Sequence, residues 1–440
     1  MSCRLWLAKV GLAFLLVACA SGDRPTGPVC QGFCPTSEGP VALMRMPVEE
    51  TADAGQTSIS DAMASDELRT QVQDLMRAKA DAVPAGVPER ALGELPLAEE
   101  GRVRLLALSS GGPFGAFGAG FLNGWSEQSE GDLVRPERFD VVTGVSAGAL
   151  LATHAFLGRE GDDVLARQYT TISTDDVFRE RSLFGALFSN AFTDTSPLRR
   201  TLEGLVTPEL LDQVADATAP DQAGGRPARL LLVLAVNLDS GLPRILDLGA
   251  IARDRTASDR VDRYIDALMA SAAISVAFPP VFIDGDMHVD GGARLALFFN
   301  RFMEDQRAAI EGRSIPAPKL DIIVNAEVTV EPACTRNTLV GIGRRSVDVV
   351  LNQLTLDGLY RTISEAERDG VDVRYVTGEG SGCPPPDDPA DPFERRFLQC
   401  LFAFGKEVGR GEAPWKTGLE NFPDPGARFG GGDASACRAG

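Results

Sequence analysis

The segment FDVVTGVSAGALLATHAFLG, residues 139–158, predicts a buried strand that turns sharply into a helix. Its apolar, β-branched run ends in GVSAG at 144–148, where a serine stands between two glycines and small residues follow. The pattern G-x-S-x-G is typical of a nucleophile elbow, a tight strand-to-helix turn that exposes a serine hydroxyl, although a glycine-rich chain contains it by chance in about one case in four. The strand before it and the helix after it favour the elbow. Ser146 would then lie at a helix N-terminus, where free N–H groups stabilise negative charge.

Outward from this turn, the chain alternates apolar runs with helical patterns. Short apolar runs bounded by glycine or polar residues predict strands, and apolar residues at a spacing of three to four predict helices. Buried strands that alternate with helices predict an α/β fold with a mostly parallel sheet and helices on both faces. The predicted strands lie within 103–112, 139–148, 229–241, 244–252, 321–330 and 372–378, and the predicted helices within 121–128, 149–158, 260–274, 339–368 and 392–411.

Composition divides the chain into segments around one ordered domain. Residues 20–58 are rich in Pro, Gly, Thr and Asp without apolar periodicity, which predicts a flexible tether. Residues 60–82 predict a helix on the domain surface, with an apolar stripe formed by Met63, Leu68, Val72, Leu75 and Met76. The predicted boundaries are a signal peptide at 1–18, the tether at 19–58, an N-terminal helical extension at 59–101, a catalytic domain at 102–377 and a cysteine-containing C-terminal extension at 378–440, packed on the same domain.

The N-terminus has the pattern of a lipid-attachment signal. Two basic residues precede an apolar stretch at 10–18 that is too short to span a bilayer. LVAC at 16–19 resembles the bacterial lipoprotein signal, in which the cysteine becomes the N-terminus and carries acyl chains such as palmitate. We therefore expect a protein of the bacterial cell envelope, anchored through Cys19 and facing the periplasm or the outside, and Ala20 and Ser21 favour an outer membrane. The alternative is an ordinary secretory signal with a chance cysteine.

The net charge and the cysteines limit the partners. A formal net charge of −19 excludes nucleic acid, because no basic patch exists to replace phosphate counterions, and it disfavours electrostatic docking on anionic lipid. Apart from Cys3 and Cys19, six cysteines predict disulfides in an oxidising compartment, with 15 possible pairings. They are Cys30, Cys34, Cys334, Cys383, Cys400 and Cys437. No metal site is expected, because the first two have no second ligand pair nearby and the two histidines are remote in sequence.

A glycine-rich loop, SSGGPFGAFGAG at 109–120, follows the first predicted strand of the domain. Backbone N–H groups in such a turn can point together at an anion, which predicts an oxyanion hole opposite Ser146. The loop fits neither the dinucleotide-binding pattern nor the Walker pattern, which needs Gly-Lys-Ser/Thr. The alternative is close packing between a helix and a strand, and this packing explains Gly118 and Gly120 in either case.

The residues alone do not decide which side chain takes the proton from Ser146. His154 lies eight residues further along the same predicted helix, about 12 Å away along its axis, which favours a structural role. His288 lies in MHVDGGARL at 287–295, on the same strand face as Asp290. A carboxylate is a weak base at neutral pH, but partial burial raises its pKa, so Asp290 is itself a candidate.

The histidine alternative requires an additional carboxylate. A triad in the chain order Ser–Asp–His would take its acid from Asp239 or Asp247 and its base from His288. Little in the local sequence supports such a triad, and chemistry alone favours Asp290 only modestly.

Three blocks occur in the order SGGPFG at 110–115, GVSAG at 144–148 and DGG at 290–292. In this order they resemble the glycine-rich loop, the nucleophile motif and the Asp-Gly-Ala/Gly motif of the patatin-like phospholipase family. ASAAISVAFPPV at 270–281 is similar to the family's segment ahead of its catalytic aspartate. Segments 237–252 and 404–415 resemble its bacterial lipoprotein branch, and the likeness is firm over 103–297 and looser to 415.

This resemblance implies a three-layer α/β/α fold and a Ser–Asp dyad that needs no metal or organic cofactor. The roles that it implies are Ser146 as nucleophile, Asp290 as general base and acid, Gly111 and Gly112 as oxyanion donors, and Gly144, Gly148, Gly291 and Gly292 as motif glycines. The chain departs from the family at Ser110, where a glycine is usual, and at Phe114, where Arg, Lys or Asn is common. Because Gly111 and Gly112 are intact, the oxyanion donors are still expected, whereas the polar group missing at Phe114 means that the family's substrate preference and level of activity are not carried over to this chain.

The implied reaction is hydrolysis of lipid acyl esters, of a phospholipid or a lysophospholipid, through an acyl-serine intermediate. The substrate would be a membrane lipid, and Phe114 and Phe117 would line an acyl groove or belong to the core. The alternatives are a Ser–His–Asp esterase that uses His288, an acyltransferase with the same residues, and an anchored lipid-binding lipoprotein with a degenerate site.

Overall fold

The computed structural model describes residues 66–83, 101–129, 131–181, 191–220, 228–298, 315–329, 334–388 and 390–419. The predicted signal peptide and tether, with Cys19, Cys30, Cys34 and Met63, lie outside the described residues, as does Cys437. Contacts divide the chain into two units. The larger unit comprises residues 58–329 and 351–423, and the smaller comprises residues 1–57, 330–350 and 424–440, of which the structure describes 334–350.

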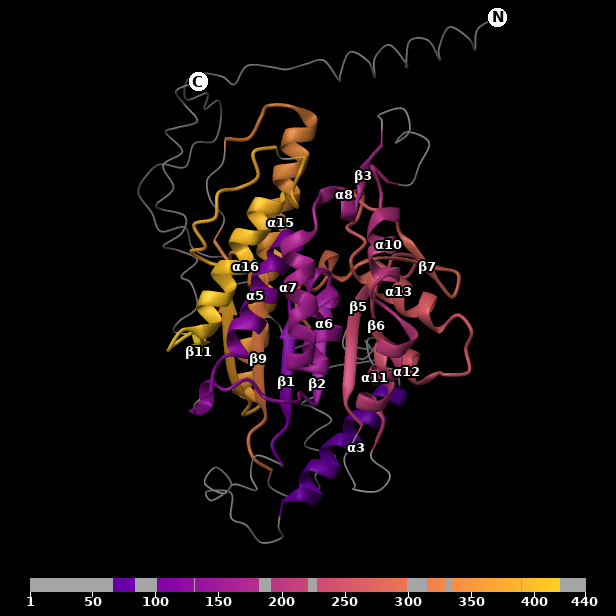
Figure 1. The fold of residues 1–440 in the computed structure, drawn as a ribbon, viewed down its shortest axis with the longest axis vertical. Coiled ribbons are helices and arrows are strands. Elements are labelled where there is room, and N and C mark those ends of the chain that lie inside the picture. The colour runs from indigo at the N-terminus through magenta and orange to yellow at the C-terminus, as the bar shows by residue number, and fades with distance from the viewer. Residues whose placement is uncertain are drawn as a thin grey trace, which may run out of the picture. The chain divides into compact units, whose positions relative to one another are not determined.

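A sheet of nine described strands forms the centre of the larger unit (Figure 1), in the order β11-β10-β9-β1-β2-β5-β8-β7 with β6 paired to β5. The five central strands are parallel to one another, which confirms the predicted mostly parallel sheet. They are β1 (Arg104–Leu108), β2 (Val141–Val145), β5 (Leu230–Asn237), β9 (Lys319–Val324) and β10 (Asp372–Thr377). The antiparallel pairs involve β6 (Leu242–Asp247), β7 (Val281–Ile283), β8 (Asp286–Asp290) and β11 (Lys416–Thr417), and a separate small sheet holds β3 (Arg179–Glu180) and β4 (Thr193–Asp194).

Helices follow most of the strands. The longer ones are α3 (Asp66–Ala82), α5 (Gly115–Trp125), α6 (Ala147–Leu157), α7 (Asp162–Thr171), α11 (Pro208–Thr218), α13 (Arg260–Ser271), α15 (Leu339–Arg368) and α16 (Arg395–Arg410). The shorter ones are α8 (Thr174–Val177), α10 (Ser196–Glu203) and α12 (Leu248–Arg253), with 3₁₀ turns that include η2 (Gly112–Phe114) and η5 (Gly291–Ala293). No described helix is long and apolar enough to cross a membrane.

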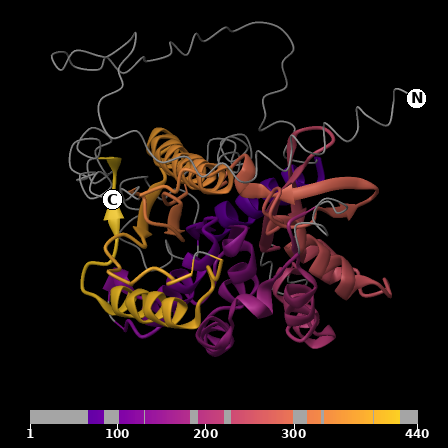
Figure 2. The ribbon, with the colours of Figure 1, turned by 90° about the horizontal axis from the view of Figure 1, so that it is seen from above.

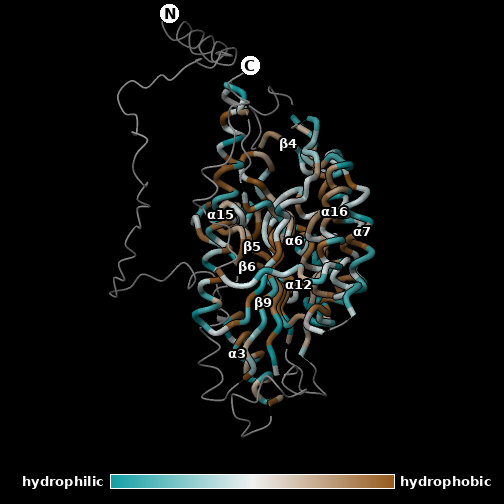
Figure 3. The backbone as a smooth tube through the Cα atoms, turned by 90° about the vertical axis from the view of Figure 1, so that its left-hand side faces the viewer, coloured by the Kyte–Doolittle hydropathy of each residue, from teal (hydrophilic) through white to brown (hydrophobic). Residues whose placement is uncertain are grey.

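Two hydrophobic clusters cover the two faces of the sheet, so the fold has three layers. Alternate residues of β1 enter different clusters: Leu106 and Leu108 join the cluster of α5, α6, α7, α13 and α16, whereas Leu105 and Ala107 join that of α3 and the second half of α15. This alternation follows from the two-residue period of a strand. Figure 2 shows α15 and α16 on opposite sides of the sheet, and Figure 3 shows hydrophobic residues along the strands between the helical layers. The predicted stripe on α3 is buried at Leu68, Val72, Leu75 and Met76, in the same hydrophobic cluster as residues of the central strands.

Helices α5 and α16 pack backbone against backbone. A Cβ on Gly120 would lie 2.0 Å from the carbonyl oxygen of Phe402, and a Cβ on Gly405 would lie 2.2 Å from that of Phe117. Gly124 and Gly409, one turn further along each helix, are equally close to the opposite backbone. Glycine is required there because any side chain would separate the helices. The prediction that Gly120 packs against a strand is therefore wrong, since its neighbour is a helix.

Disulfide bonds form in the C-terminal part of the chain. Cys383 is bonded to Cys400, which joins the segment before α16 to the helix itself. Cys334 is also disulfide-bonded. The predicted use of cysteines is thereby confirmed for these three residues.

Two predicted element boundaries are wrong. The helix predicted at 121–128 is α5, which begins at Gly115 inside the glycine-rich loop and ends at Trp125. All of α5 is buried, so packing on α16 favours a helix despite its four glycines. The strand predicted at 244–252 ends at Asp247, whose carboxylate accepts a hydrogen bond from the N–H of Ala250 (2.8 Å) and caps α12.

Candidate active site

Ser146 occupies the turn between β2 and α6. Its φ of 53° lies in the left-handed region that side-chain-bearing residues seldom adopt, and it is the N-cap of α6. The flanking glycines make the turn possible. A Cβ on Gly144 would lie 2.5 Å from the carbonyl oxygen of Gly148, and a Cβ on Gly148 would lie 2.3 Å from that of Leu108 at the end of β1. Both glycines of the motif are therefore required by close backbone contacts.

The edges of β5 determine the position of Asp290. Along residues 232–237, one edge of β5 is occupied by β6. The other edge pairs with β2 over residues 230–234 and with β8 over residues 235–237. Since β8 takes the place next to β5 where β2 stops, its last residue lies beside the residue that follows β2. The structure thus brings Asp290 to Ser146, 144 positions earlier in the chain, and the carboxylate accepts a hydrogen bond from the serine hydroxyl.

Asp290 is buried, with 6% of its surface exposed. Its carboxylate also accepts a hydrogen bond from the N–H of Gly292 (2.6 Å), and its own N–H donates to the carbonyl of Ala273 (2.8 Å). Gly291 must be a glycine, because a Cβ there would lie 2.4 Å from the carbonyl oxygen of Leu234. Burial raises the pKa of Asp290 to about 6, although the hydrogen bonds from Ser146 and Gly292 oppose this rise.

The glycine-rich loop lies against the same site. Its first glycine, Gly111, faces the end of β9, where an added Cβ would lie 1.5 Å from the carbonyl oxygen of Asn325. Gly112 adopts a φ of 53°, and an added Cβ there would meet nothing within 4 Å. Ser110 lies beside Gly292, since a Cβ on that glycine would be 3.3 Å from the Ser110 hydroxyl. The departure at Ser110 is thus adjacent to the Asp290 turn.

Three backbone N–H groups near Ser146 have no protein acceptor among the described residues. They belong to Gly111, Gly112 and Ala147, the first residue of α6. A Cβ on Gly115 would lie 3.2 Å from the Cβ of Ala147, which brings the loop next to the start of α6. Such donors at a helix N-terminus are suited to stabilise an oxyanion.

Two supporting residues, Ser271 and Asn325, were not identified from the sequence. Ser271, fully buried at the end of α13, accepts a hydrogen bond from the N–H of Ser146 (3.1 Å) and donates to the carbonyl of Leu234 (2.7 Å). Asn325 donates to the carbonyl of Ser109 (2.7 Å) and holds the start of the glycine-rich loop. In the sequence, each is a polar residue at the end of an apolar helix face or strand. This pattern does not reveal which residue the side chain contacts.

The histidines do not contact Ser146 by hydrogen bonds. His154 lies two turns along α6, as its spacing predicts, and burial lowers its pKa to about 4. His288 is buried on β8, where its Nδ1 lies 3.0 Å from the carbonyl oxygen of Asp286, and within the described residues its Nε2 has no hydrogen-bond partner. Both candidate triad acids have other partners. Asp239 accepts a hydrogen bond from the N–H of Met287 (2.8 Å), and Asp247 caps α12.

Two aromatic residues of the loop region pack on α16. Phe117 is completely buried against Phe121 and Phe404, so it belongs to the core and does not line an acyl groove. Phe114 packs edge-on against Phe397, with ring centroids 5.9 Å apart. Within the described residues, no group of three or more His, Cys, Asp or Glu side chains could hold a metal ion.

Part of the chain is similar to a known protein family. The family model described as patatin-like phospholipase matches residues 106–302. None of the curated proteins compared matches the chain. Solved structures that match include the crystal structure of VipD from Legionella pneumophila, with 11% sequence identity, 70% of this chain and 67% of that chain covered, and a TM-score of 0.27. Residues 106–302, which include both Ser146 and Asp290, are thus similar to the patatin-like phospholipase family, whose members are lipid acyl hydrolases.

Proposed function

We propose that this chain is a serine acyl hydrolase that cleaves lipid acyl esters with a Ser146–Asp290 dyad. One observation carries the proposal: the hydroxyl of Ser146 donates a hydrogen bond to a buried carboxylate whose pKa is raised to about 6. A carboxylate with this pKa is ionised at neutral pH and is a stronger base than an exposed one. The position of Ser146 at the N-terminus of α6 supports the assignment, because developing negative charge is stabilised there.

In this mechanism Asp290 accepts the Ser146 proton as Oγ attacks the ester carbonyl carbon. The N–H groups of Gly111 and Gly112, with that of Ala147, stabilise the oxyanion. The C–O bond to the alcohol breaks, the protonated Asp290 donates its proton to the leaving alkoxide, and an acyl-serine remains. Asp290 then takes a proton from water, which attacks the acyl-serine carbonyl carbon. As the bond to Ser146 Oγ breaks, Asp290 returns this proton to Oγ, and the fatty acid is released.

The substrate in this proposal is a phospholipid or lysophospholipid of the membrane to which the protein is attached. Lipidation at Cys19 would hold the domain beside that membrane through acyl chains worth about 0.8 kcal/mol per buried methylene. The signal-like pattern before Cys19 supports this anchor and a location in the bacterial cell envelope, facing the periplasm or the outside. A Cys19→Ser variant would lose palmitate incorporation and membrane attachment, whereas retention of both would refute the anchor.

Labelling of Ser146 by a fluorophosphonate is the decisive test of the proposed chemistry. The wild-type chain is expected to be labelled and to hydrolyse esters. Ser146→Ala and Asp290→Asn should each lower kcat/KM by at least 1,000-fold with the fold intact by circular dichroism, because the two residues act as a unit. His288→Ala should retain activity within a few-fold. Loss of activity in His288→Ala would favour the triad, and a folded wild-type chain that takes no label would favour a lipid-binding protein.

A further inference from the structure

The hydroxyl of Ser109 links the glycine-rich loop to the end of β9. Ser109 follows the last residue of β1 and is completely buried. Its Oγ donates a hydrogen bond to the carbonyl oxygen of Ser110 (2.7 Å) and accepts one from the backbone N–H of Asn325 (2.8 Å). A serine hydroxyl has a single proton to donate, and here that proton goes to the Ser110 carbonyl. The hydroxyl therefore ties this carbonyl to the residue that follows β9.

The carbonyl of Ser110 belongs to the same peptide group as the N–H of Gly111. The described peptide bonds are trans, so this carbonyl and this N–H point in opposite directions. A hydrogen bond that fixes the carbonyl therefore also fixes the direction of the N–H. The Gly111 N–H has no protein acceptor among the described residues, and it is an oxyanion donor in the proposed function. The Ser109 hydroxyl thus acts on a proposed oxyanion donor through one rigid peptide.

Among the residues that the structure describes, Ser109 alone forms a hydrogen bond to this peptide group. The groups on either side are held separately. The N–H of Ser110 donates to the carbonyl of Ala296 (2.8 Å), and the carbonyl of Gly111 accepts from the N–H of Phe114 (3.1 Å). Glycine adopts positive and negative φ with similar ease, so Gly111 itself does not prevent rotation of the peptide. Removal of the hydroxyl would therefore free one peptide between two anchored groups.

The side chain of Asn325 holds the preceding peptide. This residue is completely buried, and its Nδ2 donates a hydrogen bond to the carbonyl of Ser109 (2.7 Å). Its Oδ1 faces α5, where a Cβ on Gly118 would lie 2.1 Å away. Glycine at 118 therefore leaves room for the amide. Asn325 thus contacts Ser109 twice, through its backbone N–H and through its side chain.

We infer that Ser109 is a positioning residue for the oxyanion hole, and that Asn325 holds it in place. The Ser109 hydroxyl directs the N–H of Gly111 at the oxygen that becomes negative when Ser146 attacks. The inference rests on the proposed function, which supplies that oxygen. Positioned donors stabilise the transition state more than the bound ester, because the charge develops only during the attack. Loss of the hydroxyl should therefore lower kcat and leave KM nearly unchanged.

Ser109→Ala removes the hydroxyl with little change in volume. In the folded full chain it should lower kcat for 4-nitrophenyl butanoate at least tenfold, since outright loss of one donor costs about 10²–10³-fold. KM should stay within about twofold. Affinity for an alkyl trifluoromethyl ketone should fall by the same factor as kcat/KM, because Ser146 adds to its carbonyl carbon and forms an oxyanion. The ether 4-nitrophenyl butyl ether, which has no carbonyl, should inhibit both chains equally.

Two results would overturn the inference directly. One is a kcat within about twofold of wild type in the folded Ser109→Ala variant. The other is a lower kcat with unchanged affinity for the trifluoromethyl ketone, because the loss would then not involve the oxyanion.

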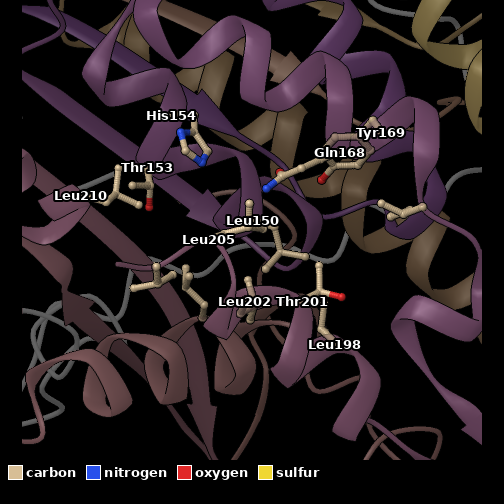
Figure 4. Close-up of a pocket in the computed structure, with 13 residues that line it drawn as sticks. Leu150, Thr153, His154, Gln168, Tyr169, Leu198, Thr201, Leu202, Leu205 and Leu210 are labelled. Atoms are coloured by element: carbon tan, nitrogen blue, oxygen red, sulfur yellow. The ribbon is translucent and has the colours of Figure 1, made fainter. Parts of the chain in front are cut away.

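Thr153→Val is the matched control. It removes a buried hydroxyl from α6, where Thr153 pairs with the hydroxyl of Tyr264 (2.8 Å). Figure 4 shows Thr153 among the residues that line an apolar pocket, together with Leu150 and Leu210. This variant should lose stability, as Ser109→Ala does, and should change kcat and ketone affinity by less than about twofold. Equal losses of kcat in the two variants would reduce the effect of Ser109→Ala to the removal of any buried hydroxyl and would overturn the positioning role.

Asn325→Ala is a second test, which also applies if Ser109→Ala does not fold. It frees the carbonyl of Ser109 and should lower kcat at least threefold, with KM within about twofold. Because both residues act on the N–H of Gly111, the double variant should have a kcat within about twofold of that of Ser109→Ala. Fully multiplicative losses, or an unchanged kcat in Asn325→Ala, would overturn the inference.

Failure of this inference is distinguishable from failure of the proposed function. A wild-type chain that neither hydrolyses esters nor takes the fluorophosphonate label would refute the hydrolase and the positioning role together. An active wild-type chain with an equally active Ser109→Ala variant would refute the positioning role alone.

Discussion

Ser146 depends on its neighbours for both conformation and chemistry. A residue with a side chain at a φ of 53° carries backbone strain, and strain of this kind persists only where the surroundings enforce it. Here the glycines at 144 and 148 permit the close turn, while Ser271 accepts the hydrogen bond of the buried Ser146 N–H. Residues 271–273 also hold the other half of the proposed dyad, because the carbonyl of Ala273 accepts the N–H of Asp290. The end of α13 thus supports both proposed catalytic residues.

Ser271→Ala is expected to impair positioning of the nucleophile. It leaves the N–H of Ser146 and the carbonyl of Leu234 without a partner, at a cost of about 1–3 kcal/mol in stability. The rate of fluorophosphonate labelling and kcat should fall at least tenfold in the folded variant, with little change in KM. Ser364→Ala, which removes a helix-surface hydroxyl bonded to the carbonyl of Tyr360, is the control and should alter none of these. A normal labelling rate in Ser271→Ala would reduce Ser271 to a packing role.

Asp290→Asn should stabilise the fold while it removes the proposed base. The pKa of Asp290 is raised above its ordinary value of 3.8 to about 6, so the folded state disfavours the charge. Ionising Asp290 therefore costs the folded state about 3 kcal/mol of stability. This cost is absent below pH 4, grows as the pH rises from 4 to 6 and is complete above pH 6. Denaturant unfolding should therefore show Asn gaining up to about 3 kcal/mol over Asp at pH 8 and nothing at pH 4. In the wild type, kcat/KM should rise with pH, with an inflection near 6, and a pH-independent difference between the variants would contradict the assigned pKa.

At the scale of elements, the sequence predicts most of the sheet, because buried parallel strands are continuous apolar runs between glycine turns. The predicted α15 agrees with the structure at both ends, from Leu339 to Arg368. The sequence does not predict which segments that are far apart in the chain become neighbours in the fold. Strand β8 lies beside the end of β2 because β6 occupies the opposite edge of β5. No local sequence pattern encodes which edge β6 takes. The resemblance to a known family, rather than spacing, therefore suggested Asp290 as the partner of Ser146. Ser271 and Asn325 were missed because their roles depend on tertiary contacts.

At the scale of elements, the glycines between α5 and α16 also predict whether a substitution raises or lowers the free energy of unfolding. Gly405→Ala would bring a Cβ to 2.2 Å from the carbonyl oxygen of Phe117, so the helices must separate. We expect a loss of about 1–3 kcal/mol in unfolding free energy, more than the gain in helix propensity. The control is Gly343→Ala on α15, where an added Cβ meets nothing within 4 Å and should add up to about 1 kcal/mol. Equal effects of the two substitutions on denaturant midpoints would contradict the close packing.

At the scale of the whole molecule, charge and the proposed anchor act in opposite directions at a membrane. The net charge of −19 repels an anionic surface, so the protein cannot use the electrostatic docking that basic proteins use. The proposed attachment would then come from apolar contact, either through acyl chains on Cys19 or through the lipid entering the site. This division makes salt a diagnostic variable, because it screens the repulsion and leaves the apolar term nearly unchanged.

The Cys19→Ser chain should therefore bind anionic vesicles more strongly as salt increases. Raising NaCl from about 10 to 150 mM shortens the screening length from about 30 to 8 Å, which should increase the fraction that co-sediments with phosphatidylglycerol vesicles severalfold. Binding to neutral phosphatidylcholine vesicles is the control and should change little. Proteins that dock through basic patches show the reverse dependence, since salt weakens their attraction. Binding to the anionic vesicles that falls with salt would reveal a local basic face able to overcome the net charge, and the anchor would then not be needed to explain membrane association.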